Sequence, residues 1–500
     1  MKEGVSGLSG DTVRFIRSEG VGLLTELNRE LFLNFSGRKI KTRIKYIYGS
    51  HRELLEPESY LSYREPACGD EEERARQRLI SSFLAGAILG GKTSGPTDMM
   101  LALEAGAEFR AGGKNLTLRS AKAALLSEPK KHKRDEIAIV DPEILSELNT
   151  LCRRKLGIMT ECAESLGFGS YGELLDAAFG TGIMRLGEEA KRFLTDTDYI
   201  ARDMLGWHFI KKMELPLKDA SVYDMTFLFN SAELRGYFPN IEPAVLSRTF
   251  LEGMALSPAR ELSSDTEKRA GKETDGFSLP LNPPFETAIS IYPAGGIHDY
   301  ESFLRCLGHS LCFCHTDPDD DFEFVFLRDG ALTDLFSGLF GGLVCEPRWL
   351  RRHLKIDADG DFLDFVRLRR LMTARLDAGR ALYAGELFGI GDPRDLPEIF
   401  TEIMNGAAQC EADGRNYIAE FLSPLSSPFR FKAALAGPGL RRFMTESFDE
   451  EWWRTGGAGD FLKGVWSEGG RITAGSLLKR CGIEDQGSKA LVRDFEAVLR

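Results

Sequence analysis

The chain has 500 residues, of which 43% are apolar and 28% charged, and its formal net charge is −12. This length and apolar content suit two or three domains, or one large helical body with two lobes, and the acidic balance argues against a nucleic-acid binder. No apolar run is long enough to span a bilayer, and the start Met1-Lys2-Glu3-Gly4 has no signal-peptide core. Nine irregularly spaced cysteines indicate free thiols in a reducing compartment, which favours the cytoplasm.

The first two hundred or so residues predict a succession of helices without a strong functional motif. Apolar residues three and four positions apart carry this prediction. They recur over 11–37, 71–87, 99–109, 121–126, 142–156, 158–166, 173–179 and 188–204.

A polar segment and one strand follow. Residues 259–277 are polar and charged, which predicts an exposed loop. Phe285 to Tyr292 is the best strand of the chain, because apolar and β-branched residues lie between prolines and a Gly-Gly pair.

Two further helices form the centre of the sequence. Asp299 is a plausible N-cap for a helix from Tyr300 to about His315. After an acidic loop at 317–321, a second apolar helix contains Asp334. The layout of helix, loop and helix is that of a zinc peptidase site, in which His-Glu-x-x-His supplies two ligands and a general base, and a later helix supplies a carboxylate.

The five-residue window reads Arg305-Cys306-Leu307-Gly308-His309, so only the second histidine remains. With its flanking landmarks, the segment resembles the thimet oligopeptidase and oligoendopeptidase F family of zinc metallopeptidases. The landmarks agree in order over about residues 190–500: Asp299-Tyr300, Gly308 to Leu311, Ala331 to Asp334, Pro347 to Leu350, Trp452-Trp453, Ala458 to Leu462 and Val465-Trp466.

The resemblance implies a mainly α, zincin-like fold. It implies two helical lobes around a deep cleft, with one small β-sheet beside the active-site helix. We expect an N-terminal helical lobe over 1–190 and a metallopeptidase-like domain over 191–500.

The same resemblance places Arg305, His309 and Asp334 at the family's zinc-ligand positions and Cys306 at that of the general base. Arginine has no lone pair to offer a metal, and one imidazole with one short carboxylate is too small a ligand set. Cys306 lacks the carboxylate that accepts a proton from water. We therefore expect no bound zinc and no catalytic residue, with His309 and Asp334 as the ligands if any metal binds. We further expect the guanidinium of Arg305 to occupy the metal position and pair with Asp334.

Three other interpretations of this helix stay open. It may be read as an ordinary core helix. Its Cys and His residues may be read as a different metal site, although the five of them point around most of the helix: Cys306, His309, Cys312, Cys314 and His315. A nucleophilic Cys306 with His309 as base is the third, but no orienting group is visible.

The resemblance also implies where a peptide would bind. In such peptidases an edge strand beside the zinc helix pairs with the substrate backbone, which needs no metal. We expect this role for Ala288, Ile289 and Ser290. The alternative is that the strand is a hairpin arm that only packs against the helix. Tyr417 falls where the family has substrate-binding tyrosines.

The sequence thus predicts a pseudo-peptidase that binds a peptide or protein, with no nucleic-acid or membrane partner. The alternatives are an active metallo-oligopeptidase with an unorthodox metal site, and a non-enzymatic scaffold or regulator that acts through its surface.

Overall fold

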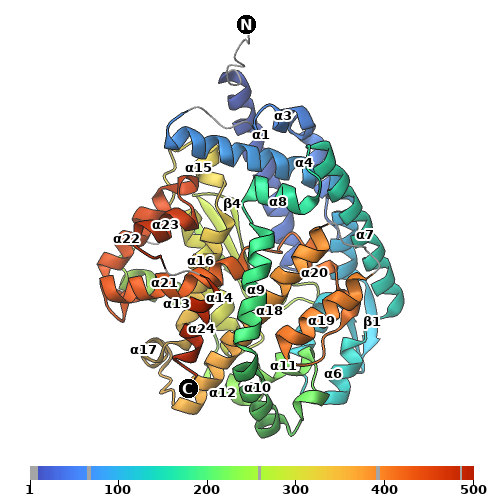
Figure 1. Ribbon diagram of the computed structural model, residues 1–500, viewed down its shortest axis with the longest axis vertical. Coiled ribbons are helices and arrows are strands. Elements are labelled where there is room, and N and C mark those ends of the chain that lie inside the picture. The colour runs from blue at the N-terminus through green and yellow to red at the C-terminus, as the bar shows by residue number, and fades with distance from the viewer. Residues whose placement is uncertain (1–9, 65–68, 257–260, 390–394, 485–486, 500) are drawn as a thin grey trace.

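The structure is a computed structural model that describes residues 10–64, 69–256, 261–389, 395–484 and 487–499. It is mainly helical, as predicted (Figure 1). The elements of the N-terminal half are α1 (Gly10–Phe35), α2 (Ile44–Ser50), α3 (Pro57–Leu61), α4 (Glu71–Gly106), β1 (Glu108–Ala111), β2 (Lys114–Thr117), α5 (Leu118–Leu125), α6 (Lys131–Ala138), α7 (Pro142–Ser165), α8 (Tyr171–Phe179), α9 (Ile183–Asp196), α10 (Asp198–Met213), α11 (Val222–Leu228), α12 (Ala232–Tyr237) and α13 (Pro243–Gly253).

The second half begins with a small sheet and continues as helices. Its elements are β3 (Glu261–Asp265), β4 (Phe277–Asn282), β5 (Glu286–Ser290), α14 (Ile297–Cys314), α15 (Phe322–Phe326), α16 (Gly330–Gly341), α17 (Pro347–Trp349), α18 (Gly360–Phe388), α19 (Leu396–Ala408), α20 (Ala419–Leu422), α21 (Arg430–Phe448), α22 (Gly456–Ser467), α23 (Ala474–Arg480) and α24 (Ser488–Glu496).

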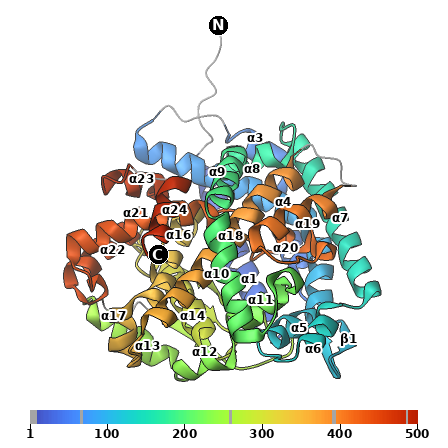
Figure 2. The ribbon, with the colours of Figure 1, turned by 60° about the horizontal axis from the view of Figure 1, so that its bottom comes forward.

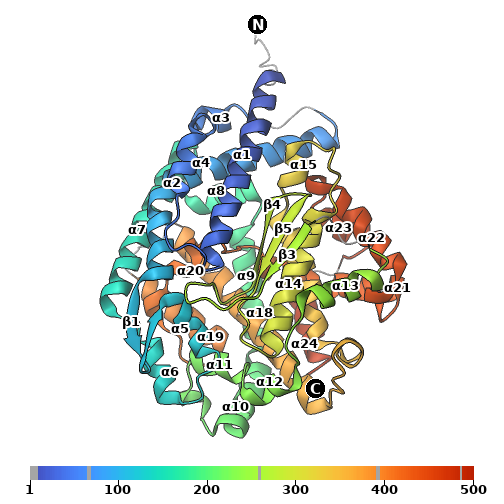
Figure 3. The ribbon, with the colours of Figure 1, turned by 180° about the vertical axis from the view of Figure 1, so that it is seen from behind.

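The three-stranded sheet has the order β3-β5-β4. β5 pairs in parallel with β3, from Glu261 opposite Glu286 to Asp265 opposite Ser290, and antiparallel with β4 on its other side. Figure 3 shows the sheet between α1, which packs against β4, and α14, which packs against both β4 and β5. The sheet therefore lies directly beside the central helix, as predicted.

The expectation of an exposed loop over 259–277 is wrong in part, because β3 (Glu261–Asp265) lies within this segment. The strand escaped notice because its residues Glu-Leu-Ser-Ser-Asp are mostly polar, and its stability comes from pairing with β5 rather than from an apolar pattern. Residues 259 and 260 of that segment lie outside the described residues.

The two halves share apolar core. One buried cluster joins α1, α4, α7 and α8 to β4, β5, α18, α19 and α20, and a second extends from α9 to the last described helix. The division at residue 190 stays a prediction. No helix in the described ranges is both long enough and apolar enough to cross a membrane.

Candidate functional site

α14 is held in the centre of the molecule by apolar side chains and by a close approach to α16. Leu304, Leu307 and Leu311 are fully buried. A Cβ built on Gly308 would lie 2.5 Å from the carbonyl oxygen of Phe336, so only glycine permits this spacing of the helices. The prediction that Asp299 is the N-cap is wrong, because the helix begins at Ile297. The Asp299 carboxylate instead accepts hydrogen bonds from the backbone N–H groups of Ala294 and Gly295.

His309 lies on the face of α14 that meets β4. Its Nδ1 is 2.8 Å from the Ser278 hydroxyl, and its ring contacts Phe313 at 5.4 Å between centroids. Burial disfavours the charged imidazolium and lowers the pKa of His309 to about 4. His309 is therefore a neutral imidazole near neutral pH, one nitrogen of which is already engaged by Ser278.

Arg305 lies one turn earlier and lines the same cavity as Asp334. Its aliphatic stem passes against Gly341 of α16. Burial acts to lower the pKa of Arg305, but nearby carboxylates, Glu301 foremost, raise it above its ordinary value, so the side chain stays a cation.

The expected direct pairing of Arg305 with Asp334 is not formed. Within the described residues, Arg305 makes no ion pair shorter than 4 Å. Asp334 instead accepts a hydrogen bond from the Ser427 hydroxyl. Burial raises the pKa of Asp334, although Ser427, Arg430 and Arg305 act to lower it. The two groups share one cavity and interact through space, not through contact.

The cysteines of α14 are buried thiols. Burial raises the pKa of Cys306 to about 12, that of Cys312 to about 12 and that of Cys314 to about 11. Thiols with such pKa values are almost entirely protonated near neutral pH, which disfavours Cys306 as a nucleophile. The eight cysteines in the described ranges are all free, and no three His, Cys, Asp or Glu side chains there converge on a metal-sized position.

The zinc that the resemblance implies does not fit these residues. The first ligand position carries a guanidinium, which cannot coordinate. The remaining donors are one nitrogen of His309 and the carboxylate of Asp334, which already accepts from Ser427. Catalytic zinc needs three protein ligands, so this donor set falls short.

The structure corrects the position expected for the strand at 285–292. β5 is the middle strand, and its backbone is paired on both sides, so Ala288, Ile289 and Ser290 cannot add a peptide to the sheet. Each of these residues is at most 1% exposed. The outer strand beside His309 is β4, which the sequence did not single out because Pro280 interrupts it.

Tyr417 is not brought to the cavity. It is 4% exposed and belongs to the core cluster of the N-terminal half. Its hydroxyl accepts a hydrogen bond of 3.2 Å from Arg153 on α7. Its proposed role in ligand binding stays a prediction.

The cavity between α14, α16, α18, α21 and α24 measures about 120 Å³. Four arginines from three of these helices line it: Arg305 of α14, Arg370 of α18, and Arg430 and Arg441 of α21. The sequence analysis missed the last three. Each lies in a helix with no motif, and only the packing of α21 against both α16 and α18 brings them together (Figure 2).

Charged side chains of both halves face one another next to this cavity. Asp275, which precedes β4, is exposed, yet burial acts to raise the pKa of its carboxyl while Lys122, His298, Arg430 and Arg305 lower it overall. The side chain of Lys122 on α5 is 64% exposed, and Glu273 foremost raises its pKa. Lys122 and Asp275 are thus solvent-exposed charges of opposite sign that lie close enough to influence each other's pKa.

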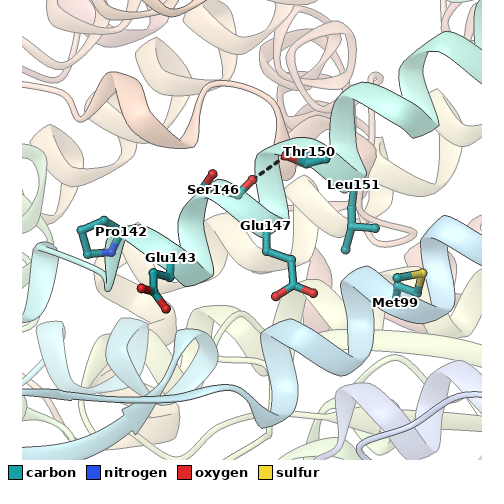
Figure 4. A pocket seen from close by; sticks show the side chains of 7 residues that line it. All are labelled: Met99, Pro142, Glu143, Ser146, Glu147, Thr150 and Leu151. Atoms are coloured by element: carbon teal, nitrogen blue, oxygen red, sulfur yellow. Dashed lines mark hydrogen bonds between the residues drawn. The ribbon is translucent and has the colours of Figure 1, made fainter.

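A second hollow lies on the outside of the N-terminal half and has a different character. It measures about 570 Å³ and is formed by the first turns of α7 and by Met99 of α4 (Figure 4). Glu143 and Glu147 face it, and Thr150 donates a hydrogen bond to the Ser146 carbonyl. None of the predicted site residues lies there, and its two carboxylates alone define no chemistry.

Comparison with known proteins gives likeness in structure alone. No family model matches the chain, and no curated protein matches it. A solved structure classed as an oligoendopeptidase F aligns with a TM-score of 0.65 and 13% identity, over 99% of this chain and 98% of that one. PZ peptidase A, with an inhibitor, aligns with a TM-score of 0.63 and 14% identity over 99% and 98%.

A carboxypeptidase of Pyrococcus furiosus aligns with a TM-score of 0.57 and 13% identity, over 99% of this chain and all of that one. The match extends over the whole length of each protein, including the sheet, α14 and α16. This chain has the mainly α, zincin-like fold of the oligoendopeptidase F type of metallopeptidase.

Proposed function

We propose that this chain binds a peptide or a protein segment in the cleft beside α14 without hydrolysing it. Its fold is that of a peptidase, but the position of the first metal ligand holds the permanent cation Arg305. This single observation carries the proposal, because a guanidinium both removes a ligand and repels a dication from the cavity that it shares with Asp334.

Two features support retention of binding. β4 forms the outer edge of the sheet next to His309, and strand addition at such an edge needs only backbone groups. Exposed charged groups near the start of β4, among them Lys122 and Asp275, are available for ion pairs with a ligand. The free thiols favour a reducing compartment, so we place the protein in the cytoplasm.

The decisive experiment rebuilds the ligand set. Arg305→His together with Cys306→Glu restores the His-Glu-x-x-His pattern on α14. We expect the purified double variant to bind one zinc per chain by elemental analysis, and the unchanged protein to bind none. Adding Asp334→Glu, with its longer carboxylate, should tighten zinc binding further.

A matched control separates this site from incidental metal. The double variant that also carries His309→Ala should lose its zinc. In parallel, the unchanged protein is assayed with a quenched-fluorescent peptide library for cleavage and by fluorescence polarisation for binding. Peptide binding without cleavage supports the proposal. Stoichiometric zinc in the unchanged protein, lost on His309→Ala, would make it an enzyme, and an absence of peptide binding would leave a scaffold that acts through its surface.

A further inference from the structure

The cavity beside Arg305 has more cations than its own carboxylates engage. Glu301 is paired with Arg369, and Asp377 lies 3.2 Å from Arg380. Asp494 lies 2.7 Å from Arg441 and 3.6 Å from Arg370. These contacts account for every lining arginine except Arg305 and Arg430.

Neither of those two arginines has a close partner in the described part of the chain. Both are partly buried, and neither makes an ion pair within 4 Å or a hydrogen bond to a described side chain. Glu301, Asp377, Asp334 and Asp275 influence one or both of them only through space. A crowded guanidinium with unused donors is costly to maintain, and oxyanions are the groups that satisfy its planar set of N–H donors best.

The space in front of the two arginines is kept open by small residues. Ala433, Ala434 and Ala374 line the cavity, together with Gly338 and Gly437. A Cβ on Gly338 or on Gly437 would meet no atom within 4 Å. Glycine inside a helix is unfavourable by roughly 1 kcal/mol relative to alanine. These two glycines therefore keep the cavity open, and no neighbouring atom requires a glycine there for close packing.

We propose that this cavity binds a small oxyanion, a phosphate or a carboxylate, between Arg305 and Arg430. The volume of about 120 Å³ corresponds to roughly four water molecules and suits such a group. Arg441 and Arg370, anchored on Asp494, form the second wall. The site belongs to the C-terminal half alone and does not depend on peptide binding in the cleft.

The test uses the full-length protein with inorganic phosphate and, in a separate arm, acetate as probes in isothermal titration calorimetry. We expect one site per chain. Tighter binding of phosphate would identify a tetrahedral oxyanion as the ligand, and tighter binding of acetate would identify a carboxylate. Heat from neither probe at millimolar concentration would overturn the proposal.

Two variants with matched controls locate the site. Arg430→Gln should weaken binding of the preferred probe at least tenfold, whereas Arg442→Gln, on the exposed side of the same helix α21, should leave it unchanged. An equal loss in both would mean general electrostatic attraction and would overturn the site.

Gly338→Leu should abolish binding by filling the cavity while all charges stay in place. Gly464→Leu is its control, since Gly464 is a helical glycine of α22 whose Cβ also meets open space but which lies outside the cavity. Circular dichroism and the melting temperature report whether each variant is folded. A folded Gly338→Leu protein that still binds the probe would disprove the assignment.

Discussion

Two successive turns of α14 contrast in their chemistry, although Arg305 and His309 are four residues apart and project from the same side of the helix. The turn of His309 meets β4 and carries a neutral imidazole engaged by Ser278. The turn of Arg305 meets α16 and carries a cation in an arginine-lined cavity with the half-buried carboxyl of Asp334. In a zinc peptidase of this fold both positions would serve one metal, whereas here they lie in separate environments.

The contrast lies in what surrounds the two side chains, since the contact between α14 and α16 is common to both turns. The spacing of α14 and α16, set by Gly308 and Gly341, does not require a metal between the helices. Burial lowers the pKa of His309 and raises that of Asp334, so it favours the uncharged form of each group. Three substitutions test whether the two turns share one helix contact and then differ in environment as described.

The largest effect should come from the contact with α16 that both turns share. Gly308→Ala places a methyl group 2.5 Å from the Phe336 carbonyl oxygen, and backbone cannot move aside cheaply. We expect a loss of about 3 kcal/mol in the free energy of unfolding, measured by urea denaturation. Gly338→Ala on α16, where the added methyl group meets open space, should instead gain about 0.5–1 kcal/mol. Equal stability of both variants would show that the helices are not in contact at Gly308.

An intermediate effect on stability is expected on acidification, from His309 beside β4. The folded-state pKa of His309, about 4, is below the ordinary value of 6.5, so between these values the unfolded chain binds a proton that the folded chain does not. Stability is therefore lost as the pH falls through this window. His309→Gln should make the urea midpoint less sensitive to pH between 6.5 and 4.

The exposed His132 provides the control, because His132→Gln should leave this slope unchanged. His315, whose pKa burial also lowers to about 4, should retain part of the acid sensitivity in the His309→Gln variant. A slope identical in the His309→Gln variant and the unchanged protein would contradict a desolvated imidazole.

The sequence predicted the fold better than the site. Landmarks such as Gly308-His309 and Trp452-Trp453 lie in order along the chain, so the mainly helical fold with a sheet beside the central helix could be inferred from them. Strand order could not, because β3 has no apolar pattern and it is the pairing with β3 that makes β5 central. Arg430 and Ser427 could not be predicted for a different reason. Each comes near Asp334 only because the start of α21 packs against α16.

The smallest effect should come from Asp334 and should have the opposite sign to that of His309. Burial raises the folded-state pKa of Asp334 above its ordinary value of 3.8, so the folded chain holds a proton that the unfolded chain has already lost. The stability that this proton contributes is present at low pH and is lost as the pH rises through the folded-state pKa. Asp334→Asn keeps an acceptor for the Ser427 hydroxyl but does not ionise. Its advantage in urea midpoint over the unchanged protein should grow from pH 4 toward pH 7, by a small amount because Arg430 and Arg305 offset part of the burial. If the advantage shrank over this range, Asp334 would be a stabilised carboxylate directly paired with a guanidinium, and the environment described for the turn of Arg305 would be wrong.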